Sequence, residues 1–109
     1  MKLITILGTR PEIIRLSSTI KLIDKYINQK IVHTGQNYDY DLNEIFFEDL
    51  GLRKPDRFMN VDVTSLGASI GDIFKKTEEI ITEENPDAML VLGDTNSCLS
   101  AYMAKRKHI

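Results

Sequence analysis

The chain of 109 residues has the size of one domain, and its 42% of hydrophobic residues suffices for one core. Its 14 basic and 16 acidic residues give a formal net charge of −2, so charge gives no indication of a nucleic-acid or membrane-surface partner. The single cysteine excludes an internal disulfide and a thiolate metal cluster, and no apolar run is long enough to span a membrane. With no signal peptide following Met1, we expect a soluble cytoplasmic domain.

The first half of the sequence predicts strands that alternate with helices. Residues Lys2–Leu7 form a short apolar run rich in β-branched residues, which is typical of a strand buried on both faces. From Pro11 onward apolar residues recur at helical spacing, and residues 30–34 predict a second strand. A helix is expected over 39–50 and a short third strand over 58–61. The inner face of that helix is expected to hold Leu42, Ile45, Phe46 and Leu50.

The second half continues the alternation. Thr64 or Ser65 is expected to cap a helix. The buried stripe of this helix is expected to contain Leu66, Ile70, Ile73, Thr77 and Ile80. A strand over 88–92 and a helix over 95–107 follow, and the basic residues at the end of that helix suit its C-terminal dipole.

The chain is expected to be part of a longer one. His108 and Ile109 follow a basic helix end and resemble the start of another strand. A four-stranded sheet that ended there would expose an unpaired edge. We therefore expect residues 1–109 to form an incomplete N-terminal Rossmann-like domain.

Strands and helices alternating at these lengths predict βαβ units. The expected fold is therefore α/β, with a Rossmann-like parallel sheet covered by helices on both faces. Ligands bind such sheets at the carboxyl ends of the strands. Here those ends carry residues 8–12, 34–40 and 93–97, which are richer in polar side chains than a simple connection requires. We expect the functional site at this edge.

The first of these loops is Gly8-Thr9-Arg10-Pro11-Glu12. Gly8 permits a sharp turn and a closely approaching ligand, and the next helix directs its N-terminal N–H groups at an anion. Arg10 adds a planar, charged fork suited to phosphate. An ordinary turn with a surface arginine is the alternative. The glycines of a dinucleotide fingerprint are missing and no P-loop motif is present, so neither NAD nor P-loop chemistry is favoured.

The second loop, His33-Thr34-Gly35-Gln36-Asn37-Tyr38-Asp39, offers an imidazole, two amides and a phenol. His33 stands among apolar neighbours, which favours a structural role over a ligand. Gln36 and Asn37 lie beyond the strand, where they can face the cleft. Asp41 is interpreted as a helix cap rather than a functional carboxylate.

The third loop is Gly93-Asp94-Thr95-Asn96-Ser97. A carboxylate at the end of a buried strand, beside a helix N-terminus, is well placed for proton transfer or for holding a substrate hydroxyl. Asp94 would also serve as a cap for the last helix, but Thr95 or Asn96 would cap it equally well. No set of His, Cys, Asp and Glu residues has metal-ligand spacing, and no cofactor is expected.

The motifs GTRPE, HTGQNYD and GDTNS, taken in this order at three strand ends, resemble the non-hydrolysing UDP-N-acetylglucosamine 2-epimerase family. The resemblance covers the whole chain but only about the first third of a family member. It implies a glycosyltransferase-B arrangement, in which the active site lies between two Rossmann-like domains. The second, nucleotide-binding domain would then be absent from residues 1–109. A full-length homodimer with a UDP-sugar substrate is expected.

The resemblance also implies a reaction, inversion at C2 of the sugar. The C2 proton is removed while UDP leaves C1, which gives a glycal; UDP then adds back and a proton reaches the other face of C2. The match places Arg10 on the diphosphate side and Asp94 in the acid/base set. Arg15 stands where the commoner branch has lysine, which keeps the charge and changes the donor geometry. The other expected substrate contacts are Gly8, Thr9, Gln36, Asn37 and Thr95.

Departures from the family pattern concern completeness and substrate. The family's next glutamate motif and its second-domain histidine would lie beyond Ile109, so little activity is expected of the chain alone. Gln36-Asn37 replaces a Gln-His pair of the commoner branch. Together with Ile14-Arg15-Leu16-Ser17 and Asn96-Ser97, this is closer to the branch that epimerises 6-deoxy-L-sugar nucleotides on the way to UDP-N-acetyl-L-fucosamine. Both branches serve surface polysaccharide synthesis.

Other functional classes remain as alternatives. A non-catalytic Rossmann module that pairs with a partner chain is one, and a different glycosyltransferase-B enzyme is another. A receiver-type signalling domain is disfavoured, because it needs acidic residues at the end of the first strand, where this chain has Leu7-Gly8.

Overall fold

Four parallel strands form one sheet in the order β3-β2-β1-β4. The computed structural model describes residues 1–93 and 95–109, but not the side chains of residues 37–39. The strands are β1 (Lys2–Leu7), β2 (Asn28–His33), β3 (Arg57–Phe58) and β4 (Ala88–Leu90). Because β1 lies between β2 and β4, its carboxyl end is next to the loops that follow both neighbours.

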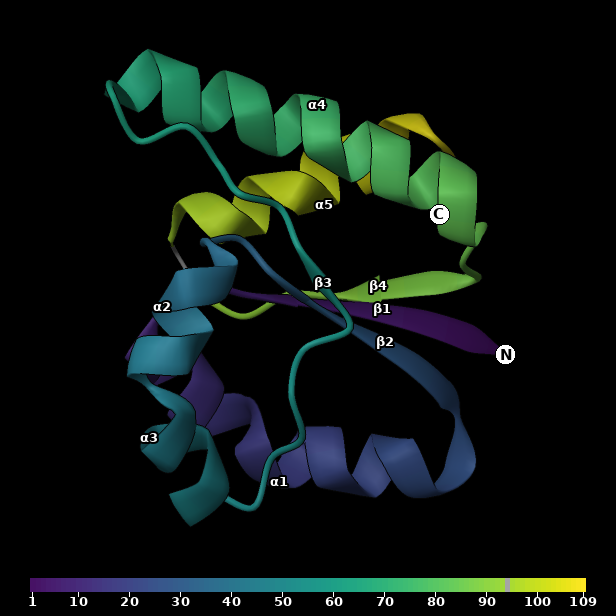
Figure 1. Cartoon of the computed structure of the whole chain (residues 1–109). Coiled ribbons are helices and arrows are strands. Elements are labelled where there is room, and N and C mark those ends of the chain that lie inside the picture. Colours follow the sequence, from purple (N-terminus) through teal and green to yellow (C-terminus); the bar gives the residue numbers. More distant parts are fainter. Residues whose placement is uncertain (94) are drawn as a thin grey trace.

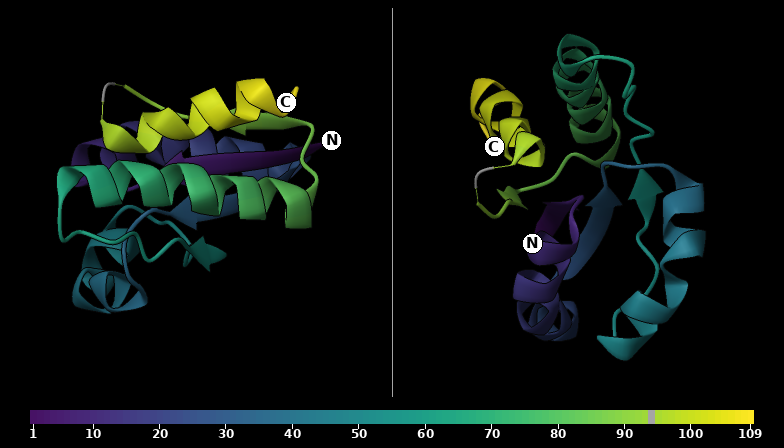
Figure 2. Two further views of the ribbon diagram at one scale, coloured as in Figure 1. Left: turned by 90° about the horizontal axis from the view of Figure 1, so that it is seen from above. Right: turned by 90° about the vertical axis from the view of Figure 1, so that its left-hand side faces the viewer.

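Helices cover both faces of the sheet (Figure 1). One face carries α1 (Arg10–Tyr26), α2 (Asn37–Leu42) and α3 (Glu44–Asp49). The other carries α4 (Leu66–Glu84), the 3₁₀ turn η1 (Asn96–Leu99) and α5 (Ser100–Arg106), as the end-on view in Figure 2 shows. The predicted α/β fold with a parallel sheet is confirmed. In the part of the chain that the structure describes, no helix is long and apolar enough to cross a membrane.

Two apolar cores lie on opposite faces of the sheet. The core under α1, α2 and α3 contains Leu7, Ile13, Leu16, Ile20, Ile31, Tyr40, Phe47 and Leu52. The core under α4 contains Ile4, Ile6, Val32, Met59, Val61, Ile73 and Ile80. Successive residues of a strand point to opposite faces, so β1 contributes to both cores and is buried on both sides, as predicted.

A reciprocal cap fixes the start of α1. The Thr9 hydroxyl accepts a hydrogen bond from the Glu12 backbone N–H, and the Glu12 carboxylate accepts one from the Thr9 backbone N–H. This is a capping box, with Pro11 in the first turn, where its missing N–H costs no hydrogen bond. The cap sets the direction in which α1 leaves β1 and therefore the shape of the first polar loop.

The predicted helix over 39–50 is wrong in its continuity and in half of its inner face, because Phe46 and Leu50 pack against the core as predicted but Leu42 and Ile45 do not. The chain forms α2 and α3 with a break at Asn43, and Asp41 lies inside α2 rather than at a cap. Leu42 and Ile45 are 78% and 73% exposed, whereas Tyr40 and Phe47 are buried. Apolar side chains occupy so many positions between residues 40 and 50 that the helical pattern fits more than one buried face.

The predicted helix over 95–107 is also divided. It begins as the 3₁₀ turn η1 and becomes α-helical only at Ser100. At its end His108 is left-handed, with φ 64°, and the Ile109 N–H donates to the Ala104 carbonyl at 2.9 Å. This pattern is a Schellman cap, so His108 and Ile109 close α5 instead of beginning a strand.

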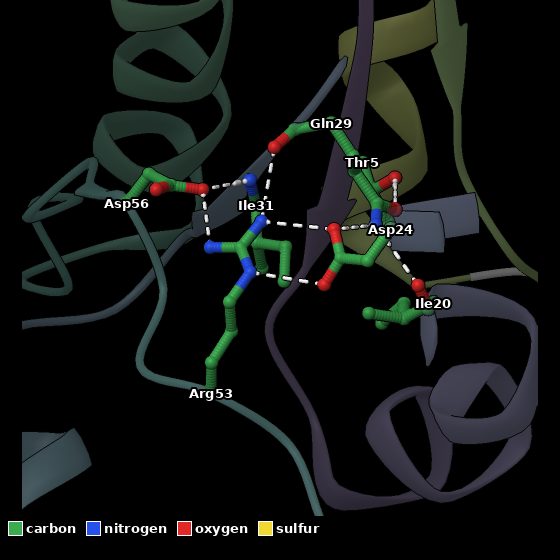
Figure 3. A network of polar contacts seen from close by, with 7 residues as sticks. All are labelled: Thr5, Ile20, Asp24, Gln29, Ile31, Arg53 and Asp56. Atoms are coloured by element: carbon green, nitrogen blue, oxygen red, sulfur yellow. Dashed lines mark hydrogen bonds and ion pairs between the residues drawn. The ribbon is translucent and has the colours of Figure 1, made fainter. Parts of the chain in front are cut away.

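The amino ends of the strands are joined by a polar network centred on Arg53 (Figure 3). Its guanidinium binds Asp24 at 3.0 Å and Asp56 at 2.7 Å, and it donates to the Gln29 carbonyl at 2.9 Å. The Gln29 side chain accepts from Thr5 and donates to the Ile20 carbonyl and to Asp24. The network ties the end of α1 to β2 and to the approach to β3, and it leaves the other end of the sheet free for a site.

Candidate functional site

The three polar loops meet at the carboxyl edge of the sheet. Along the chain the strands progress from β1 to β2 and β3 on one side, and β4 then lies on the other side of β1. The segments that follow β1 and β4 therefore leave toward opposite faces, with α1 on one and α5 on the other (Figure 2). In open α/β sheets such a switch point leaves the crevice in which ligands bind.

Glu12 bridges this switch point. Its Oε2 accepts hydrogen bonds from the backbone N–H groups of Gly8 and Thr9, both at 2.8 Å. Its Oε1 accepts from the hydroxyl of Thr95 and from that of Ser97. One carboxylate therefore connects the turn after β1 with the loop after β4, and it is only 4% exposed.

The expectation that backbone N–H groups of the first loop cradle a phosphate needs revision. The N–H groups of Gly8 and Thr9 are directed at a carboxylate that belongs to the chain itself. The positive end of α1 thus already has an anion beside it. The side chain in this loop that is suited to meet an external phosphate is that of Arg10.

Arg10 lines a cavity of about 250 Å³ together with His33 and Phe46. Its guanidinium donates to the Asn43 side-chain oxygen, and its Cζ lies 5.4 Å from the centroid of the Phe46 ring. A hydrogen bond and a cation–π contact together orient this charged fork, although the side chain is exposed. Such an oriented guanidinium suits a phosphate oxygen pair.

Two further cavities adjoin the first. One of about 410 Å³ is lined by Gly8, Gln36 and Thr95 among others, and it shares Gly8 with the Arg10 cavity. The other, of about 340 Å³, is lined by Arg15 and Glu12 and shares Thr9 and Thr95 with the second. The structure thus gathers Gly8, Thr9, Arg10, Arg15, Gln36 and Thr95 at one edge. It places Arg10 and Arg15 in separate cavities. Asp94 and the side chain of Asn37 lie outside the described residues.

His33 has a structural role, as predicted. Its side chain is buried, with ring centroids 5.7 Å from Phe58 and 6.5 Å from Phe47. Its Nδ1 accepts a hydrogen bond from the Gly35 backbone N–H at 2.8 Å. Within residues 1–93 and 95–109, no three His, Cys, Asp or Glu side chains are grouped in a way that could hold a metal ion.

The residue of the candidate site that sequence reasoning misses is Glu12. In the sequence it only ends the first loop, yet in the structure it joins two loops through contacts 83 and 85 residues apart. A local signal is present, because threonine followed three residues later by glutamate is the pattern of a capping box. The bonds to Thr95 and Ser97 have no local signal.

The charge state of Glu12 follows from its partners and predicts a pH effect. Burial by itself would raise its pKa, but hydrogen bonds from Ser97, Thr95, Thr9 and Gly8 stabilise the carboxylate and bring its pKa below the usual 4.5. Because the folded-state pKa is the lower one, this stabilisation is complete above pH 4.5 and is lost as the pH falls through the folded-state value.

We therefore expect the stability difference between wild type and Glu12→Gln to be largest at neutral pH and to shrink as the pH falls below 4.5. Urea unfolding of both proteins over a pH series measures it. A difference that stayed constant, or that grew in acid, would contradict an ionised Glu12 in the native state.

Gly8 is required by a close contact. A Cβ placed on it would lie well under 3.0 Å from Oγ1 of Thr34, at the end of β2. We expect Gly8→Ala to destabilise the chain by about 1–3 kcal/mol, the usual cost of forcing an extra methyl group into a packed position. Gly67→Ala in α4 is the control, because the added methyl group would have no atom within 4 Å and alanine favours a helix by about 0.5–1 kcal/mol. Equal unfolding midpoints for the two variants would show that the contact does not matter.

Comparisons with known proteins identify the family. Residues 21–109 match the family described as UDP-N-acetylglucosamine 2-epimerase. The UDP-2,3-diacetamido-2,3-dideoxy-D-glucuronate 2-epimerase of Pseudomonas aeruginosa is 40% identical over 98% of this chain and 31% of its own length. The structure of UDP-N-acetylglucosamine 2-epimerase from Rickettsia bellii matches with a TM-score of 0.93 and 51% identity, over 100% of this chain and 29% of that one.

The Methanocaldococcus jannaschii UDP-GlcNAc 2-epimerase, solved in complex with UDP-GlcNAc and UDP, matches with a TM-score of 0.89 and 40% identity. The match covers 100% of this chain and 31% of that one. The chain thus spans less than a third of the length of each of these relatives. From the sequence match and the shared fold, the chain belongs to the UDP-N-acetylglucosamine 2-epimerase family.

Proposed function

We propose that this chain is the N-terminal part of an isomerase that inverts C2 of a UDP-2-acetamido sugar, and that it supplies one wall of the active site. The observation that carries the proposal is the meeting of the three motif loops at the switch point of the sheet, with Arg10 and Arg15 lining the adjoining cavities. In support, a relative 40% identical to the chain was solved with UDP-GlcNAc and UDP.

The proposed reaction breaks and re-forms one C–O bond. A base takes the C2 proton, the C2–H electron pair becomes the C1=C2 double bond, and the C1–O bond breaks with its electrons on the departing diphosphate. In the return step the same diphosphate oxygen attacks C1, and an acid delivers a proton to the opposite face of C2. Removal of a weakly acidic C–H proton and growth of negative charge on UDP are the two demands on the site.

The residues are assigned to these demands by their chemistry. Arg10 is proposed to bind the diphosphate, because its guanidinium is oriented by Asn43 and Phe46 toward a cavity. Arg15 is proposed as a second cation on the other side of the first loop. Asp94 is proposed as a member of the acid/base set. The other proposed substrate contacts are Gly8, Thr9, Gln36, Asn37 and Thr95.

A complete enzyme needs more than this chain. We propose a second Rossmann-like domain that faces these loops in a glycosyltransferase-B arrangement, and a homodimer of the full-length protein. Residues 1–109 alone are then expected to have little or no activity. The pathway we propose is surface polysaccharide synthesis in the cytoplasm.

A second substrate is favoured by specific residues. Gln36-Asn37 at the end of β2 and Asn96-Ser97 after β4 resemble the branch that acts on a UDP-6-deoxy-L-sugar and gives UDP-N-acetyl-L-fucosamine. Gln36, Asn96 and Ser97 line the same cavity of about 410 Å³. Asn96 and Ser97 thus lie where the sugar is proposed to bind, whereas Gln36 is common to both branches and the side chain of Asn37 lies outside the described residues.

The test is to incubate the full-length protein in deuterated water with each nucleotide-sugar separately. Deuterium at C2, detected by mass and by NMR, together with appearance of the C2 epimer, is the result that this function predicts. Faster exchange with one sugar assigns the substrate. If neither sugar exchanged, the isomerase proposal would fail and a non-catalytic binding module would be favoured.

A further inference from the structure

Glu12 occupies a position that ordinary helix capping does not explain. A capping box needs only one contact between the glutamate side chain and the N-cap backbone, here the bond from Thr9 N–H to Oε2. Oε1 points instead across the switch point, to hydroxyls that follow β4. We propose that Glu12 is a positioning residue that holds the loop 95–97 against the turn after β1 and fixes the direction of the hydroxyl protons there.

The proton count at this cluster leads to the proposal. Three oxygens lie in mutual contact: Glu12 Oε1, Thr95 Oγ1 and Ser97 Oγ, with 2.7 Å between the two hydroxyls and 2.5 Å from Ser97 to Glu12. An ionised carboxylate supplies no proton, and each hydroxyl supplies one. Only two protons are therefore available for three contacts, so both are used within the cluster and none is left for a ligand.

As a consequence, the Thr95 hydroxyl acts toward the cavity as a hydrogen-bond acceptor and not as a donor. Ser97 is buried, whereas Thr95 is partly exposed and lines the cavities of about 410 and 340 Å³. With its proton committed to the cluster, the Thr95 oxygen offers only lone pairs to the cavity. It therefore accepts a hydrogen bond from a hydroxyl or amide N–H group and disfavours an ionised phosphate oxygen, which has no proton to donate.

This polarity determines which end of a UDP-sugar lies near Thr95, and this step of the inference rests on the proposed function. The diphosphate lies on the Arg10 side, where a cation faces the cavity of about 250 Å³. The sugar, whose hydroxyl and acetamido N–H groups are donors, lies against Thr95. Glu12 is 4% exposed and both of its carboxylate oxygens are already bonded within the chain, so its role is exerted through the Thr95 hydroxyl.

Glu12→Gln is the variant that isolates this role. The amide oxygen can still accept from Gly8 and Thr9, while the amide NH₂ donates to Thr95 and Ser97. One hydroxyl proton then serves the Thr95–Ser97 contact, and the other is released toward the cavity. The shape is kept and only the polarity changes. Asp24→Asn is the matched control, because Asp24 is also a hydrogen-bonded carboxylate, accepts from Arg53 and Gln29, and lies at the opposite end of the sheet.

The experiment measures C2 exchange kinetics and urea unfolding on the full-length protein. Glu12→Gln is expected to lower kcat/KM by about 10- to 100-fold, the scale of loss when a hydrogen-bonding group is left without its partner. Asp24→Asn is expected to lose stability with kinetics unchanged. In a Thr95→Val background, Glu12→Gln is expected to lower kcat/KM by less than about twofold, because residues that act through one group are not additive.

Several results would overturn the inference: wild-type kinetics for Glu12→Gln, or the same loss from it with and without the Thr95 hydroxyl. If Glu12→Gln does not fold, Thr95→Val tests the same inference, because it leaves the cap of α1 intact. Thr95→Val is expected to lose activity, and Thr95→Ser is expected to retain activity. Wild-type kinetics for Thr95→Val would also overturn the inference. Absence of exchange in the wild type would instead overturn the proposed function, so the two failures are distinct.

Discussion

Replacing Asp94 by asparagine is expected to lower kcat of the full-length protein by about 10²- to 10⁴-fold, the usual contribution of a positioned general acid or base. Asparagine has nearly the same shape but cannot take up or release a proton at neutral pH. KM is expected to change much less than kcat, since binding and proton transfer depend on different properties of the side chain. The measurement is the initial rate of C2 deuterium exchange over a range of nucleotide-sugar concentrations.

Asp87→Asn provides the control for this prediction. Asp87 precedes β4 at its amino end and accepts a hydrogen bond from the Lys2 backbone N–H at 2.8 Å, so it belongs to the same segment but the opposite edge of the sheet. Its replacement is expected to leave kcat unchanged. If Asp94→Asn behaved like Asp87→Asn, Asp94 would be a helix cap and not part of the acid/base set.

Phe47→Ala is expected to have the largest effect on folding. Phe47 is 2% exposed, and its ring packs at 5.0 Å between centroids from Tyr40 and at 6.5 Å from His33. Removing a buried aromatic ring leaves a cavity that costs about 3–5 kcal/mol. Urea unfolding of the chain measures the loss, and α2 and α3 are expected to lose their order first because this ring anchors them to the sheet.

Ile45→Ala, two residues earlier on the same helix, is the matched control. Ile45 is largely exposed, so its truncation is expected to change stability by no more than about 0.5 kcal/mol. Comparable losses for the two variants would mean that the face predicted from the sequence, with Leu42 and Ile45 inward, is the correct one.

The strand–helix order could be predicted because β1 and β4 lie in short, largely apolar runs, residues 3–7 and 88–92, each followed by a glycine. The run Lys2–Leu7 matches β1 at both ends. The strand expected over 88–92 is shorter in the structure, where only Ala88–Leu90 pair with β1. Pairing depends on the register of the neighbour, which no local pattern contains.

Two segments, residues 37–50 and the loop after β4, have structures that the sequence pattern could not predict. Between residues 37 and 50 nearly every register of a helix would bury aromatic side chains, so the choice of Tyr40 and Phe47 depends on the rings of His33 and Phe58 that they contact. In the loop after β4, Ser97 is drawn to Glu12 across 85 residues. The 3₁₀ turn η1 contains this residue, and no local pattern of the sequence predicts the bond that it makes.

The sequence predicted which loops form the candidate site, but it did not predict the hydrogen bonds between them. Parallel topology alone places residues after β1, β2 and β4 at one edge, and the structure brings Arg10, Gln36 and Thr95 there. The N-terminus of α1 predicted a phosphate at the first loop, but the carboxylate at the fifth position of that loop lies there instead. Glu12 satisfies the same N–H groups, so anion binding is proposed for the Arg10 and Arg15 side chains instead.

The central claim is that the carboxyl edge of the sheet forms one side of a UDP-sugar binding site. Amide hydrogen exchange of the full-length protein, with and without saturating UDP, tests it most directly. We expect slower exchange in peptides that cover residues 8–15 and 93–99, with no change around the Arg53 network at the opposite end of the sheet. Slower exchange near Arg53, with the strand-end peptides unaffected, would contradict the claim.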